Sequence, residues 1–116
     1  MDAAYTVHCA LGPGLLESVS EACLAHELTQ RGLAIRTQAP MPVVYGGLTL
    51  EPGYRLDVLV DGQLIVEVKA VEMLTTVHLA QLRTHLKLSG LQLGFAINFN
   101  VARIEDGIRR VAVCPR

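Results

Sequence analysis

The chain has 116 residues, 51% of them hydrophobic, and this length favours one compact domain over residues 1–116 with a packed core. Its formal net charge is -1, aromatic residues make up 4% and Trp is absent, which excludes both a surface coated in positive charge and a base-stacking platform. Any contact with nucleic acid must therefore be local, through a small patch, a metal ion or a partner.

The first predicted element is a helix over residues 15–31. It begins after the Gly-Pro-Gly sequence at residues 12–14 and ends before Gly32, a residue type that commonly follows a helix C-terminus. Its apolar positions recur at helical spacing: Leu15, Val19, Ala22 and Cys23.

A β region with turn residues follows this helix. Pro40 and Pro42 force a break or a sheet edge, Gly46-Gly47 is typical of a hairpin turn, and the Glu-Pro-Gly sequence at residues 51–53 predicts another turn. Asp61-Gly62 separates the two clearest strands. The predicted strands cover residues 34–38, 43–45, 54–60 and 64–71.

The last third of the chain predicts a helix over residues 76–89, ended by Gly90, and then strands over residues 93–99 and 108–113. With residues 34–38 and 43–45 counted as one strand broken at the prolines, the element order is α-β-β-β-α-β-β. This order predicts an α/β domain in which a mixed β-sheet is flanked by helices.

The cysteines and the N-terminal sequence bear on the location of the protein. The chain has three cysteines that lack C-x-x-C spacing, which argues against a disulfide framework or a zinc ribbon. The first residues lack a basic segment followed by an apolar one, and the longest apolar stretches are too short to span a bilayer. We therefore expect a cytoplasmic protein with no membrane partner.

Ionisable residues mark one face of each of the two clearest strands. Side chains alternate between the faces of a strand, so Asp57 lies on the face opposite the apolar side chains of its strand. By the same alternation, Glu67 and Lys69 share the face opposite the apolar side chains of the next strand. Each strand thus has one wholly apolar face.

The hairpin loop decides whether these charged faces coincide. A two-residue Asp61-Gly62 loop places Asp57 and Glu67 on opposite faces of the sheet. A three-residue loop over residues 60–62, with its glycine left-handed, pairs Asp57 with Ile65 and brings the charged faces together. Because the other register would bury the charges, the sequence predicts the three-residue loop or an equivalent bulge.

Asp57 and Glu67 on one face would favour a divalent cation between them. Mg²⁺ prefers a few oxygen ligands and several waters, and the backbone carbonyl of Val68 could supply a further oxygen. Such a metal lowers the pKa of bound water and neutralises charge on a transferring phosphate. Lys69 projects to the same side and could orient the attacking water.

Two helix residues could complete the site. Glu17 lies in the first turn of the first helix and could add a carboxylate. Gln81 lies on one stripe of the second helix with His78 and His85, both of which we expect at the surface or facing a partner. The simpler interpretations are a carboxylate favoured by a helix N-terminus for Glu17 and surface polarity for Gln81.

Four segments of the sequence resemble the GxxExxY family, small bacterial proteins assigned to the PD-(D/E)XK nuclease superfamily. The resemblance runs from about residue 7 to residue 113. An aspartate, nine residues, then Glu-x-Lys would be a weak signal alone, but the blocks occur in the family's order and spacing. The segments are GPGLLESVSEACLAHELTQRGL, GYRLDVLVDGQLIVEVKAVE, HLAQLRTHLKLSG and LGFAINFNVARIEDGIRRV.

The resemblance implies a restriction-endonuclease-like core and a Mg²⁺- or Mn²⁺-dependent site. Asp57, Glu67 and Lys69 fall on the superfamily's catalytic pattern, Glu17 on the family's naming motif and Gln81 on the glutamine of its second helix. The sequence departs from the family at position 20. There the motif's tyrosine is replaced by a serine, Ser20.

We therefore expect hydrolysis of nucleic-acid phosphodiester bonds, with DNA favoured over RNA, Asp57, Glu67, Val68 and Glu17 at the metal, and Lys69 and Gln81 assisting. A domain of this size encloses little duplex, so a homodimer or a larger protein partner is expected. The alternatives are a catalytically inactive interaction or structural module, and a hydrolase of smaller phosphoesters. In the simplest interpretation, Asp57, Glu67 and Lys69 only form ion pairs on a solvated sheet face.

Overall fold

The computed structural model describes residues 2–114, so the domain expected over residues 1–116 extends past this range at both ends. Helices, strands and one 3-10 turn follow one another in the order α1 (Asp2–Leu11), α2 (Glu17–Gln30), β1 (Ile35–Tyr45), β2 (Leu48–Val60), β3 (Leu64–Lys69), α3 (Thr76–Ser89), β4 (Leu93–Asn98), η1 (Ile104–Gly107) and β5 (Ile108–Ala112). None of the described helices is long and apolar enough to cross a membrane.

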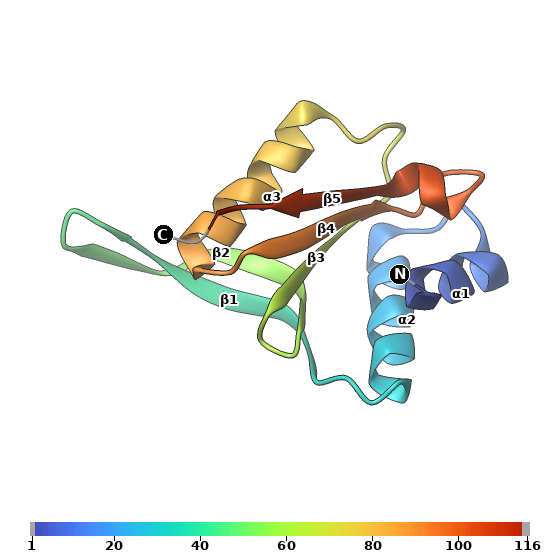
Figure 1. Cartoon of the computed structure of the whole chain (residues 1–116), viewed down its shortest axis with the longest axis horizontal. Helices are drawn as coiled ribbons and strands as arrows, with labels where there is room; N and C mark the ends of the chain where they lie inside the picture. The colour runs from blue at the N-terminus through green and yellow to red at the C-terminus, as the bar shows by residue number, and fades with distance from the viewer. Residues whose placement is uncertain (1, 115–116) are drawn as a thin grey trace.

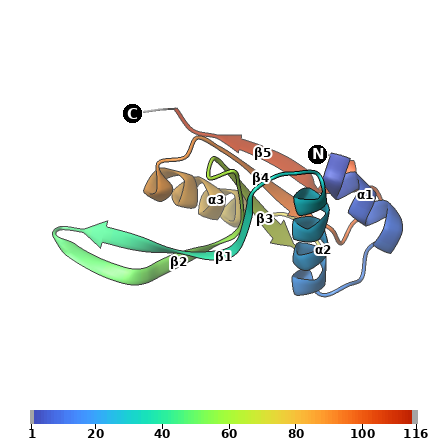
Figure 2. The same cartoon turned by 90° about the horizontal axis from the view of Figure 1, so that it is seen from below.

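The strands form one mixed sheet in the order β1-β2-β3-β4-β5 (Figure 1). Strands β3 and β4 are parallel, and all other neighbours are antiparallel. Helices α1 and α2 cover one face of the sheet and α3 covers the other (Figure 2). The prediction of an α/β domain with a mixed sheet between helices is confirmed.

Strand β3 lies at the centre of this sheet and contributes to two hydrophobic cores. Val66 and Val68 pack with the side chains of α1 and α2, whereas Ile65 packs with Leu82 and Leu86 of α3. Because side chains alternate along a strand, Glu67 lies on the same face as Ile65, beneath α3. The charged face of the hairpin is therefore covered by a helix, and it is not the solvated sheet face of the simplest interpretation.

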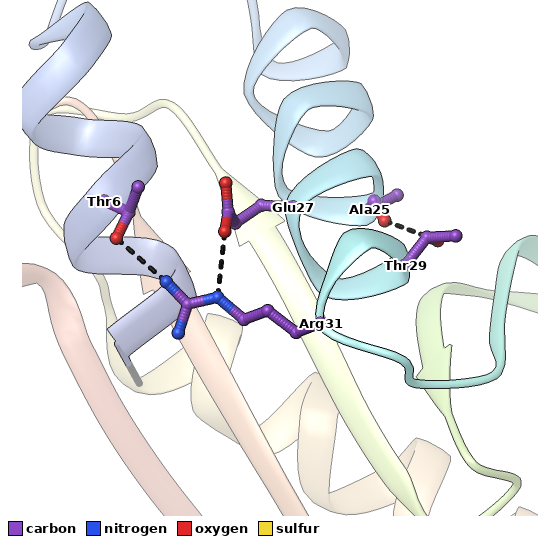
Figure 3. Close-up of polar contacts among 5 residues, drawn as sticks. All are labelled: Thr6, Ala25, Glu27, Thr29 and Arg31. Carbon is purple, nitrogen blue, oxygen red and sulfur yellow. Dashed lines mark hydrogen bonds and ion pairs between the residues drawn. The ribbon is translucent and has the colours of Figure 1, made fainter.

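Helix α1 was not expected from the sequence. A ten-residue helix is marginal by itself, and α1 gains its stability from packing Ala3, Ala4 and Val7 into the core shared with α2. Arg31, just after α2, also joins the two helices. Its guanidinium donates to Thr6 Oγ1 at 3.0 Å and forms an ion pair with Glu27 at 2.9 Å (Figure 3).

Helix α2 begins and ends close to the predicted bounds, but it buries a different face. Its buried side chains are Ser20, Leu24 and Leu28, at four-residue spacing, while Val19 of the predicted stripe is 39% exposed. Ser20 is 3% exposed. The position that distinguishes this chain from the GxxExxY motif therefore lies between α2 and the sheet, where a tyrosine would need much more space.

Strands β1 and β2 continue through the breaks that were predicted within them. Pro40 and Pro42 lie inside β1, where the strand is a sheet edge and a register shift falls between Met41 and Val43. The turn predicted at residues 51–53 is wrong, because these residues lie within β2. Strand β2 pairs with β3 only over Val58–Val60, so the rest of the β1-β2 hairpin projects away from the sheet (Figures 1 and 2).

Candidate functional site

The β2-β3 hairpin has the three-residue loop that the sequence predicted, but it lies one residue later. Val60 pairs with Leu64, which leaves residues 61–63 outside the ladder. Asp61 and Gly62 both have positive φ, at 52° and 66°. Continuing the register places Asp57 opposite Glu67, so the predicted pairing of Asp57 with Ile65 is wrong. The two registers differ by two residues and give the same faces, so the carboxylates still meet.

Asp57 is held against β3 through its own carboxylate. Its Oδ2 atom accepts a hydrogen bond from the backbone N–H of Val68 at 2.9 Å. Burial, and then the negative charge of Glu67, raises the pKa of Asp57 to about 7, although the Val68 hydrogen bond acts in the opposite direction. The Asp57 carboxyl group is therefore poised to change its ionisation near neutral pH.

Glu67 is 4% exposed and lies against α3. Its Oε1 atom is 2.7 Å from Nδ1 of His85, which is itself buried and stacks on the ring of Tyr54 with the centroids 4.9 Å apart. The imidazole of His85 can donate a hydrogen bond from Nδ1 to this carboxylate oxygen. His85 thus contacts one oxygen of Glu67, and the Glu67 side chain also interacts with Asp57.

The expected surface position of His85 is wrong. His85 lies three residues after Leu82 and one before Leu86, and both leucines are fully buried on the face of α3 that packs on the sheet. That spacing is the signal that could have placed His85 on the buried face of the helix. Gln81, by contrast, is exposed one turn earlier on α3.

Two glutamates of α2 approach the same end of the sheet. Glu17 Oε1 accepts a hydrogen bond from the backbone N–H of Ala70 at 3.0 Å, which links the start of α2 to the residue after β3. Glu21, which we did not predict, has a pKa raised first by burial and then by the charges of Glu17 and Glu67, although a hydrogen bond from Gln38 opposes the shift. Its position four residues after Glu17 on one helix face was the available signal.

Val68 and Lys69 end β3 beside these carboxylates. The carbonyl of Lys69 accepts from the N–H of Phe99, on the β4 side of the strand. Successive carbonyls along a strand point to opposite neighbours, so the carbonyl of Val68 points towards β2, where Asp57 lies. The Lys69 side chain is half-buried and shares the face of Glu67.

Asn98 fixes the chain just beyond the site. Its side-chain amide donates to the carbonyl of Val71 at 2.8 Å and accepts from the N–H of Val71 at 3.1 Å. Asn98 is 1% exposed and pairs with Lys69 across the parallel ladder. The amide thus replaces strand pairing where β3 ends, two residues before the predicted end.

The arrangement brings some predicted residues together and leaves others apart. Asp57, Glu67 and the backbone of Val68 form one cluster, and Glu17 lies at its border through Ala70. Within residues 2–114, no side-chain hydrogen bond joins Lys69 or Gln81 to this cluster. Both stand next to it, Lys69 two residues after Glu67 and Gln81 one turn before His85.

These oxygen atoms fit a hard divalent cation that keeps most of its water. No group of three or more His, Cys, Asp or Glu side chains within the described chain is close enough to enclose a metal ion. Mg²⁺, however, is commonly held by one or two carboxylates together with waters and substrate oxygens. The pair of like charges that raises the pKa of Asp57 is what such a cation would relieve.

A family model described as the PD-(D/E)XK nuclease superfamily matches residues 1–111. No curated protein and no solved structure matches the chain.

Proposed function

The chain belongs to the PD-(D/E)XK nuclease superfamily, and from this membership we propose that it is a metal-dependent nuclease that hydrolyses phosphodiester bonds in nucleic acid, DNA rather than RNA. Nucleases of this superfamily generally depend on divalent metal ions. The finer assignment to the GxxExxY family is part of the same proposal and rests on the four sequence segments quoted above.

One observation carries the proposal. The carboxylates of Asp57 and Glu67 are drawn together in a partly buried place, where Asp57 has a pKa of about 7. A surface ion pair does not require two carboxylates close together in a partly buried position, whereas a cation site does. Two buried like charges are unfavourable until a cation binds between them.

Each residue then has a part in the proposed reaction. Asp57 Oδ1, the second carboxylate oxygen of Glu67 and the carbonyl of Val68 would hold Mg²⁺ or Mn²⁺, with Glu17 at the border of the site. The bound metal would supply a water of lowered pKa and neutralise charge on the phosphate. Lys69 would orient the attacking water and stabilise negative charge on the phosphate oxygens.

The first test is metal binding without substrate. We expect calorimetry with Mn²⁺ to detect binding by the wild-type chain and not by Asp57→Ala, while Asp106→Ala, which removes an exposed aspartate outside the site, binds like wild type. Equal binding by wild type and Asp57→Ala, or no binding by either, would contradict the metal site and favour a catalytically inactive interaction module.

The second test is cleavage. The chain has two lysines, Lys69 and Lys87, and Lys87 is exposed on α3, which makes Lys87→Ala a matched control. We expect Lys69→Ala to lower cleavage of single-stranded or duplex DNA by at least about a hundredfold, as loss of a group that stabilises the transition state does, while Lys87→Ala cleaves normally. Equal trace cleavage by all three proteins would indicate contamination.

A further inference from the structure

The projecting part of the β1-β2 hairpin, residues 41–54, is here called the arm. Its strands pair with each other from Met41 and Tyr54 to Tyr45 and Leu48 at the tip. No residue of β3 pairs with it, since β3 joins β2 only over Val58–Val60. Both views show the arm extending away from the helices (Figures 1 and 2).

The tip of the arm is apolar and exposed. Tyr45 is 80% exposed, Val44 is 66%, Leu48 is 56% and Leu50 is 50%. Residues 37–50 contain no Asp, Glu, Lys or Arg. A surface that binds the nucleic-acid backbone needs Lys or Arg for the phosphates, so this composition is that of a surface covered by protein.

The base of the same arm is hollowed. Pro40, Met41, Pro42, Glu51 and Pro52 line a hollow of about 400 Å³. Three of these five residues are prolines, whose rigid rings form apolar walls. The exposed ring of Tyr45 lies four residues along β1 from Met41, which corresponds to roughly 13 Å of strand. One arm thus carries both a protruding ring and a hollow suited to a ring.

From this self-complementarity we propose that the arm is a homodimer contact in which two copies of the chain lay their arms side by side in opposite directions. A two-fold axis then places the Tyr45 ring of each copy in the hollow of the other, so that both features are filled by one contact. The arm carries one charged residue, Glu51, in the wall of the hollow, and no charge between Met41 and Leu50.

The size of the arm sets the strength of this contact. Each copy offers the surface of two short strands. This surface is smaller than the roughly 800 Å² that each partner buries in a standard interface. We therefore expect a dimer that dissociates in the micromolar range. The inference does not depend on the proposed nuclease activity, because it concerns residues outside the carboxylate cluster.

The test is the mass of the full chain in solution, measured by sedimentation from about 1 to 200 μM without metal or substrate. We expect wild type to shift from monomer to dimer over this range, and Tyr45→Lys to raise the dissociation constant at least about tenfold. Tyr5→Lys is the matched control, since Tyr5 is 56% exposed on α1, away from the arm, and should dimerise like wild type. Leu48→Lys gives a second variant, and circular dichroism checks that each variant is folded.

Several results would overturn the proposal. One is a wild-type chain that remains monomeric throughout the range. Another is dimerisation that both folded arm variants keep unchanged, since it would place the contact elsewhere. A third is a monomeric wild type in which Tyr45→Lys weakens binding of a labelled oligonucleotide, because it would assign the arm to nucleic acid. Failure of the metal and cleavage tests would leave the dimer measurement unaffected.

Discussion

At the scale of single residues, the unfolding free energy of the chain depends on the ionisation of Asp57. Its pKa is about 7 in the folded chain and near 3.9 in an unfolded one. Between these values the folded chain binds more protons than the unfolded chain. Stability must therefore fall as pH rises through this window, and it is fully retained only below the unfolded pKa.

We expect the unfolding free energy of the metal-free wild-type chain to fall by about 1 to 2 kcal/mol more than that of Asp57→Asn between pH 4 and pH 7.5, after allowance for solvent screening of a half-buried group. Asparagine keeps the shape of the side chain but cannot ionise. Urea denaturation in the presence of a chelator at each pH measures the difference.

Asp106→Asn serves as the control for this experiment, because Asp106 is exposed in the η1 turn. Its pH dependence should follow wild type. If wild type and Asp57→Asn respond to pH in parallel, burial and the charge of Glu67 do not raise the pKa of Asp57, and the proposed metal site loses its basis.

The sequence located this pair but not its surroundings. Spacing and strand alternation were enough to place Asp57 and Glu67 on one face, since a period of two is fixed by the strand backbone. The helical spacing of Leu82 and Leu86 places His85 on the buried face of α3, but it does not reveal the partner of its ring. Whether a histidine on a helix is buried depends on what lies opposite, and here that is Glu67 of another element.

At the scale of elements, the loop between β2 and β3 sets which faces meet. Deleting Gln63 leaves Asp61-Gly62, a dipeptide that suits a two-residue hairpin loop. Val60 can still pair with Leu64 across that loop, so the register of the ladder and the shared face of Asp57 and Glu67 are kept. We expect this deletion to change the unfolding free energy by less than about 1 kcal/mol, because the paired residues and the buried faces stay the same.

Gln63→Ala tests whether loop length or the side chain matters. Gln63 is exposed, so this substitution should change the unfolding free energy by less than about 0.5 kcal/mol. Denaturant titration of the deletion, the substitution and wild type compares them directly. A deletion variant that loses more than about 3 kcal/mol relative to Gln63→Ala would show that the hairpin depends on the third loop residue.

Elements with strong local patterns were predictable, and those held by distant contacts were not. Helix α3 and strands β3 and β4 follow from apolar spacing and from Gly90 at the helix end. Helix α1 depends on packing against α2 and the sheet, which no local pattern reveals. The Glu-Pro-Gly sequence favours a turn locally, yet the pairing of Leu50 and Tyr54 with β1 on either side keeps it within β2, opposite the register shift in β1.

At the scale of the whole molecule, the arm beyond its base lies outside both hydrophobic cores. The core residues and the partly buried side chains packed on them include Met41 and Tyr54 at its base but none of residues 42–53. Replacing residues 43–50 with Asn-Gly, a dipeptide that closes hairpins, should therefore change the unfolding free energy by less than about 1 kcal/mol while abolishing the dimer.

Thermal or urea unfolding at a concentration where wild type is monomeric measures the first effect, and sedimentation measures the second. The concentration matters because association stabilises the folded chain. If the shortened chain loses more than about 2 kcal/mol as a monomer, the arm supports the fold and is more than a contact surface.

The hydrogen bond from Val68 to Asp57 has a consequence for spectroscopy. Most amides in a central strand donate to a backbone carbonyl, whose charge never changes, whereas the amide of Val68 donates to a carboxylate that titrates near neutral pH. Its proton resonance therefore senses the charge of Asp57 directly. An isotope-labelled wild-type chain thus contains its own indicator of proton and metal occupancy, at a backbone position that no substitution needs to disturb.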